Sequence, residues 1–201
     1  MKITVIVEGK TEKVFLPFLR VFLGRHLTPM PAIDTQKHDG RIPKGEKLRR
    51  DVHNLLEGDS DYVIALTDVY TGSDDFKDAA DAREKMRGWV DSGDRDRFFA
   101  HAAQYDFEAW LLPYWDSIQR LAGHNRSIPS GNPENVNHNK PPSYHIREIF
   151  RVGNCRDDYV KTRDAARILK DKDLSVSIRA CAELRAFVET FFKLCGRESP
   201  F

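Results

Sequence analysis

The sequence predicts an α/β fold in which a parallel sheet is flanked by helices and followed by a helical C-terminal extension. Short apolar stretches occur at residues 3–7, 62–67 and 98–102, the first of them rich in β-branched residues, and amphipathic helical patterns separate them. Strands that alternate with helices in this order form parallel sheets with helices on their faces.

The first predicted unit is a strand, a turn and a helix. Residues 3–7 lack polar–apolar alternation, which is typical of a short strand buried on both faces. From Thr11 onward, apolar side chains recur at spacings of three and four, forming a helical stripe of Val14, Phe15, Phe18, Leu19 and Phe22. The turn between strand and helix contains Glu8 and Gly9.

The middle of the chain repeats this alternation. A basic, turn-rich segment at 38–50 leads into a helix that ends near Glu57-Gly58-Asp59. The elements expected next are a strand at 62–67, a helix at 79–90, a strand at 98–102 and a helix at 107–114.

The C-terminal third differs in composition. Residues 125–143 are rich in Asn, Pro and Ser, and we expect a long surface loop of the kind that often carries function. Helices are expected after it at about 144–152, 157–170 and 176–195. This order predicts an α/β core at 1–118 and a loop with a helical extension at 119–201, packed on the core as one compact unit.

Composition narrows the class of protein. The 201 residues suffice for one hydrophobic core, and a formal charge of +1 neither identifies nor excludes a nucleic-acid binder. Cys155, Cys181 and Cys195 are odd in number and widely spaced, which argues against a disulfide framework and a thiolate zinc site. Because no apolar stretch approaches the roughly 20 residues of a membrane span, we expect a cytoplasmic protein without membrane contact.

Acidic residues follow the predicted strands near the points where they end. Glu8 follows the first strand, Asp68 the second, and Glu108 comes shortly after the third. Because the carboxyl ends of parallel strands meet at one edge of a sheet, we expect these carboxylates to converge. Converging carboxylates repel one another unless a cation neutralises them, and Mg²⁺ or Mn²⁺ suits oxygen ligands beside substrate phosphate.

Other acidic residues have simpler structural explanations. Glu12 at a helix start is favoured by the helix dipole alone, by ~0.3–1 kcal/mol. Asp74 and Asp106 each precede a helix and are suited to cap it. Gly9-Lys10-Thr11 is not the end of a phosphate-binding loop, because Thr4 stands where the first glycine of that motif is required.

Taken together, these residues resemble the Toprim-like family. Its pattern has an acid-Gly turn after the first strand, here Glu8-Gly9, and an Asp-x-Asp at the end of a later strand, here Asp68-Val69-Tyr70. More closely, the chain resembles a bacterial Toprim-related family catalogued as a domain of unknown function and similar to the nuclease halves of OLD-type and ATPase-partnered defence proteins. Further segments that carry the resemblance are Val7–Glu12, Asp106–Leu111, Pro133–Asn137, Pro141–Ser143 and Tyr159–Lys161.

The resemblance implies a magnesium-dependent nuclease that cuts DNA or RNA, in a phage-defence system and beside an AAA- or ABC-type partner ATPase. Lys161 or Lys10 would stabilise the charge that develops on the phosphate. The implied metal ligands are Glu8, Asp68 and Glu108, with Glu12 as a further catalytic group beside them.

One departure from the family pattern bears on mechanism. The second acid of Asp-x-Asp is replaced by Tyr70. Either Asp74 or Asp75 supplies the missing ligand, or the site holds one metal ion rather than two. The remaining alternative is a binding or regulatory subunit of the partner ATPase that does not cleave nucleic acid.

The segment at 37–50 is the most basic part of the chain, and its cations suit a phosphate backbone. We expect Arg41, Lys44 and Lys47, together with Lys10, to contact substrate, with an affinity that falls steeply as salt rises. The alternative is an ordinary solvated helix face, because Leu48 already orients that helix toward the core.

Overall fold

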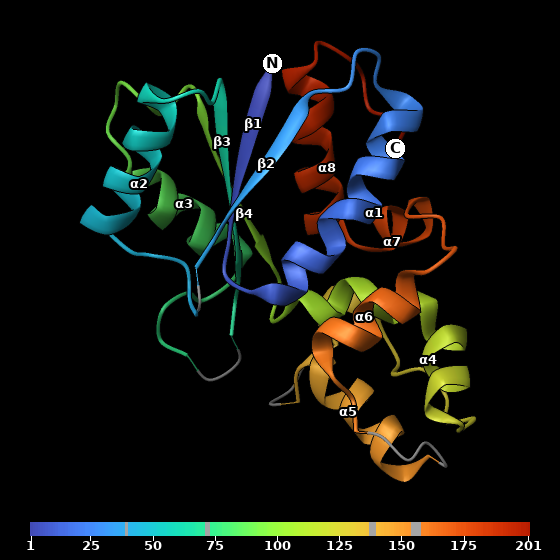
Figure 1. The fold of residues 1–201 in the computed structure, drawn as a ribbon. Coiled ribbons are helices and arrows are strands. Elements are labelled where there is room, and N and C mark those ends of the chain that lie inside the picture. Colours follow the sequence, from blue (N-terminus) through green and yellow to red (C-terminus); the bar gives the residue numbers. More distant parts are fainter. Residues whose placement is uncertain (39, 71–72, 137–139, 154–157) are drawn as a thin grey trace.

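A computed structural model shows a parallel sheet with helices on both faces (Figure 1). It describes residues 1–38, 40–70, 73–136, 140–153 and 158–201, so Asp39, Asn137 and Cys155 lie outside the described residues. Within these ranges, every helix is too short or too polar to span a lipid bilayer.

The sheet has four parallel strands in the order β2–β1–β3–β4. Their bounds are Lys2–Val7 for β1, Ala32–Lys37 for β2, Tyr62–Asp68 for β3 and Phe98–Ala103 for β4. The inner strands β1 and β3 are buried along almost their whole length, which explains their near-continuous apolar sequences. The predicted α/β fold class is confirmed.

Two hydrophobic cores lie on opposite faces of the sheet. The helices that cover these faces are α1 (Lys10–His26) and α8 (Ala182–Leu194) on one side, and α2 (Glu46–Glu57) and α3 (Ala79–Trp89) on the other (Figure 1). Val5 and Val7 of β1 belong to the core beneath α1, whereas Ile6 belongs to the core beneath α2. Successive side chains of a strand point to opposite faces, so β1 must be apolar at each of these positions.

Strand β2 was not predicted from the hydrophobic pattern. It lies at the edge of the sheet beside β1, and its residues Ala32 and Asp34 are exposed. An edge strand that buries little of its surface does not need the apolar run that identifies β1 and β3. The pairing with β1 therefore decides the conformation of this segment.

The C-terminal part of the chain is helical, as predicted, but its elements differ in detail. Residues 107–114 form a 3₁₀ helix, and an α-helix that was not predicted follows it directly. The bounds are Phe107–Tyr114 for η1, Trp115–Ala122 for α4, Pro133–Asn135 for η2, Pro142–Val152 for α5, Lys161–Leu169 for α6 and Ser175–Ala180 for α7.

The predicted helix at 176–195 is divided at Cys181, whose backbone is extended with φ −121° and ψ 109°. Both carboxylate oxygens of Glu134 accept a hydrogen bond from the Glu183 amide at 3.1 Å, which satisfies an otherwise unpaired N–H group at the start of α8. The helix expected at 157–170 begins at Lys161, where the Asp164 carboxylate accepts a 2.8 Å hydrogen bond from the Val160 amide.

Helices α4, α5 and α6 gather beyond the carboxyl end of the sheet (Figure 1). Aromatic contacts join η1, which leads into α4, to the helices α1 and α8 that cover one face of the sheet. Phe15 of α1 packs against Phe107 and Trp110 of η1, and Trp110 stacks on Phe187 of α8 with ring centroids 6.1 Å apart. These contacts hold η1, and Glu108 within it, beneath the end of the sheet.

Candidate active site at the carboxyl edge of the sheet

Five carboxylates gather where β1, β3 and β4 end, and each is at most 6% exposed. They are Glu8 after β1, Glu12 in the first turn of α1, Asp68 at the end of β3, and Asp106 and Glu108 after β4. Their closeness shows in the electrostatics, because the charges of the other four all raise the pKa of Asp68. The predicted convergence of Glu8, Asp68 and Glu108 is therefore present in the structure.

Glu8 is held by three hydrogen-bond donors, two at or just after the end of β3 and one from the segment before α2. The Thr67 hydroxyl donates to Oε1 and the Tyr70 hydroxyl donates to Oε2. The Ile42 amide donates to Oε1 at 3.3 Å. Burial, followed by the charges of Asp68 and Glu8, raises the pKa of Tyr70, so its hydroxyl stays protonated and remains a donor.

Glu12 has both a structural and an electrostatic role. Its Oε2 accepts a 3.1 Å hydrogen bond from the Gly9 amide at the start of α1, which is the capping interaction expected of an acid at this position. A Cβ atom at Gly9 would lie only 3.3 Å from this oxygen, which favours glycine there. Burial raises the pKa of Glu12, and the charges of Glu8 and Glu108 raise it further.

Asp68 lies at the centre of the acidic group. Burial is the largest cause that raises its pKa well above the usual value, followed by the charges of Glu12, Glu8, Asp106 and Glu108. Carboxylates that repel one another in a buried site favour proton uptake or the binding of a cation.

Asp106 belongs to the site, although the sequence supported only a capping role. Its Oδ2 accepts a 3.2 Å hydrogen bond from the Ser143 amide at the start of α5, and it makes no side-chain cap to η1. Its Oδ1 is buried and has no hydrogen-bond partner among the described residues. Burial and the charge of Glu108 raise the pKa of Asp106 to about 7. The two acids in Asp106-Phe107-Glu108, just after a strand, are the sequence signal that could have identified it.

Glu108 is completely buried and is paired with a cation from α6. Its Oε2 accepts a 2.9 Å hydrogen bond from the Lys161 ammonium, and its Oε1 accepts one of 3.2 Å from the Tyr159 hydroxyl. Burial by itself lowers the pKa of Lys161, but the charges of Glu108, Asp106 and Asp68 together raise it above its usual value. Lys161 therefore remains an ammonium beside the carboxylates.

The donor chemistry of this site fits a hard divalent cation. All five groups offer oxygen ligands, and Asp106 Oδ1 is a buried acceptor that no residue in the described part of the chain pairs with. Within the described ranges, no three His, Cys, Asp or Glu side chains are arranged closely enough to hold one metal ion. Glu8 and Glu108 are instead engaged by hydroxyl and ammonium groups.

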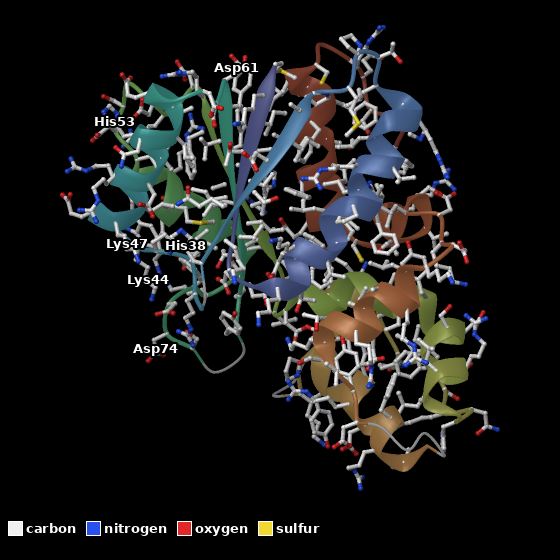
Figure 2. All side chains as sticks on the ribbon, viewed as in Figure 1. His38, Lys44, Lys47, His53, Asp61 and Asp74 are labelled. Atoms are coloured by element: carbon white, nitrogen blue, oxygen red, sulfur yellow. The ribbon has the colours of Figure 1, made fainter. Side chains whose placement is uncertain are left out.

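The remaining predicted site residues lie outside the acidic group. Asp74 is exposed on the loop after β3, and Figure 2 shows it on the same side of the molecule as Lys44 and Lys47. Asp75 forms ion pairs with Arg41 and Lys44, so part of the expected phosphate-binding charge is already neutralised.

Two of the predicted cations, Arg41 and Lys10, lie on different segments of the chain. Besides its ion pair with Asp75, the Arg41 guanidinium lies over the ring of Tyr70, 4.9 Å from the ring centroid, and Tyr70 in turn contacts Glu8. Lys10 is exposed at the start of α1, two residues after Glu8.

Family membership follows from a match over most of the chain. Residues 7–191 match the model of a family described as "Domain of unknown function (DUF4276)". The chain belongs to the DUF4276 family. All five carboxylates of the site, and Lys161, fall within the matched part of this DUF4276 chain.

Two solved structures share the fold of this DUF4276 chain. The C-terminal region of the Burkholderia pseudomallei OLD protein is 15% identical, with a TM-score of 0.53, and the match covers 96% of this chain and 98% of that one. The C-terminal region of the Xanthomonas campestris pv. campestris OLD protein is 14% identical, with a TM-score of 0.50 and 96% of each chain covered. No curated protein sequence matches the chain.

Proposed function

We propose that this DUF4276 chain is a Toprim-like, magnesium-dependent nuclease that hydrolyses phosphodiester bonds in DNA or RNA. The observation that carries the proposal is the group of five buried carboxylates, with Lys161 beside them, at the carboxyl edge of a parallel sheet. The acid-Gly turn at Glu8-Gly9 supports the Toprim-like assignment, and the likeness to the OLD C-terminal regions supports the fold on which it rests.

The site offers oxygen donors for a metal ion and an ammonium group for the phosphate. Asp68, Asp106, Glu8 and Glu108 are the oxygen donors that would hold magnesium, and their side chains would have to draw closer together around the ion to do so. The bound ion would supply a Lewis acid for a phosphoryl oxygen and would acidify water. The Lys161 ammonium lies where it can balance negative charge on the phosphate.

The direct test is nucleic-acid cleavage. Purified protein is incubated with supercoiled plasmid and with tRNA, in Mg²⁺ or Mn²⁺ and then in chelator. We expect cleavage that requires the metal ion and is lost in Glu8→Gln and Asp68→Asn, because both changes remove a charged ligand. Asp116→Asn, an exposed carboxylate on α4, is the matched control and should cleave normally. Cleavage that persists in chelator, or in both site variants, contradicts the proposal.

A second candidate is a regulatory subunit that binds but does not cleave. The observation that favours it is Tyr70, which stands where the family pattern has an acid and whose hydroxyl engages Glu8 Oε2. In that case the chain would act through a neighbouring AAA- or ABC-type ATPase. Co-expression with the adjacent ATPase gene should then yield a stable complex, and the isolated chain should leave nucleic acid intact in any metal ion.

A further inference from the structure

We propose that single-stranded nucleic acid reaches the acidic site along a lysine-lined groove between α1, α6 and the end of β2, which we call the α1–α6 groove. The groove has a volume of about 680 Å³ and is lined by residues of these three elements. Helices α1 and α6 pack directly against each other, with α6 beside the first half of α1 (Figure 1). This inference rests on the proposed nuclease function and names the form of its substrate.

The charge of the groove favours a polyanion. Lys10 and Lys13 of α1 and Lys37 of β2 line it, and no Asp or Glu is among the described residues that do so. Lys10 and Lys13 are exposed, so their ammonium groups are accessible to a ligand. A phosphate backbone that must approach five buried carboxylates is repelled by them, and cations along its path offset that repulsion.

The rest of the lining is largely apolar. Val14, Pro17 and Phe18 of α1 face Ala166 of α6 there, and each of these side chains is at least partly exposed. Unpaired bases can stack on an aromatic ring and bury their faces against apolar side chains, whereas a duplex keeps its bases paired and presents mainly phosphate. A groove lined by both cations and apolar side chains is therefore better matched to a single strand than to a duplex.

Two residues that line the groove are close in sequence to residues of the acidic site. Lys10 lies two residues after Glu8, at the start of α1. Thr162 lines the groove next to Lys161, whose ammonium contacts Glu108. A nucleic-acid strand bound over α1 and α6 would therefore lie next to the segments that carry Glu8 and Lys161.

This path differs from the one expected from the sequence. The basic segment before α2 holds Arg41 and Lys44, and both are ion-paired with Asp75. Phosphate would have to compete with that carboxylate for them. Lys13 was not singled out from the sequence. It lies one turn after Lys10, and Lys37 joins these two lysines only when β2 is placed beside α1.

The test measures binding in chelator, where cleavage plays no part. The probe is a short fluorescein-labelled oligothymidylate, followed by fluorescence anisotropy against the full chain, with oligouridylate, a duplex of equal length and oligoglutamate as comparisons. We expect Lys13→Glu to weaken oligothymidylate binding roughly tenfold or more, since it replaces a phosphate contact by repulsion. Phe18→Leu keeps the apolar volume but removes the ring, and should weaken binding of single strands more than of duplex.

Lys193→Glu, an exposed lysine at the end of α8, is the matched control and should bind like wild type. Lys13→Ala is the milder variant if Lys13→Glu does not fold. Equal binding by wild type and the groove variants, tighter binding of duplex than of single strand, or equal binding of oligoglutamate overturns the inference. So does wild type that binds no oligonucleotide. None of these results decides the nuclease proposal, which rests on the metal-dependent cleavage assay with Glu8→Gln.

Discussion

The hydroxyl of Tyr70, just after β3, donates a hydrogen bond to Oε2 of Glu8, just after the neighbouring strand β1. A residue that stands in the place of an expected acid thus becomes a neutral partner of another acid. The aromatic ring continues outward to Arg41, whose guanidinium lies 4.9 Å from the ring centroid. Tyr70 therefore links the buried carboxylates to the basic segment before α2.

Two substitutions of Tyr70 distinguish its contribution to folding stability from its effect on metal binding. Tyr70→Phe removes one donor from a buried carboxylate and should lower the unfolding free energy by about 1.5–3 kcal/mol, as measured by urea denaturation in chelator. Tyr70→Asp adds a negative charge and should be less stable in chelator, but Mn²⁺ should stabilise it more than it stabilises wild type. A Tyr70→Asp protein that gains nothing from Mn²⁺ would argue against a metal site at this position.

The ion pair between Lys161 and Glu108 should be strongly coupled, because Glu108 is completely buried. Lys161→Met leaves this carboxylate without its cation and should destabilise the fold by roughly 2–3 kcal/mol, less than for a fully buried pair because Lys161 is partly exposed. Adding Glu108→Gln to Lys161→Met should recover part of the loss. The unfolding free energies of both single variants and the double variant are measured by urea denaturation. If the double variant loses the sum of the two single losses, the pair is not coupled.

Stability in chelator should depend on pH through Asp106. Its pKa is raised from 3.8 to about 7 in the folded protein, so the folded state binds this proton more tightly than the unfolded chain does. The resulting stabilisation is fully present below about pH 4 and is lost as the pH rises through 7. The unfolding free energy attributable to this group should therefore fall across that window, and Asp106→Asn should flatten the profile. An unchanged slope in Asp106→Asn would assign the titration to another group.

Metal removal should lower thermal stability if the carboxylates hold magnesium. At a free ion concentration about 100 times its Kd, binding stabilises the folded state by about 2.7 kcal/mol. We therefore expect the melting temperature to fall when chelator is added and to recover with Mg²⁺ or Mn²⁺ but not with K⁺. Asp68→Asn should no longer respond, whereas the exposed control Asp116→Asn should respond like wild type. This calorimetric readout does not depend on cleavage.

The hydrophobic pattern determines much of the fold from sequence alone. Strands β1 and β3 are recognisable because a strand buried on both faces must be apolar at nearly every position, and α1 is recognisable because one stripe of its surface faces the core. The positions of Glu8, Asp68 and Glu108 then follow from topology, since the carboxyl ends of parallel strands share one edge.

Other elements are decided by tertiary contacts. Strand β2 carries little apolar signal, and its hydrogen bonds to β1 impose the extended conformation. The break at Cys181 depends on the Glu134 carboxylate, which is distant in sequence and binds the Glu183 amide. Local sequence patterns do not report such contacts between remote segments.

The same distinction applies to the site. Sequence determined which acids follow the strands, because that order is local. Only the tertiary structure placed Asp106 among them, engaged Glu8 with Tyr70, and set Lys161 of a distant helix against Glu108. The physical reason is that burial and mutual repulsion, which give these carboxylates their chemistry, exist only when separate segments of the chain are packed together.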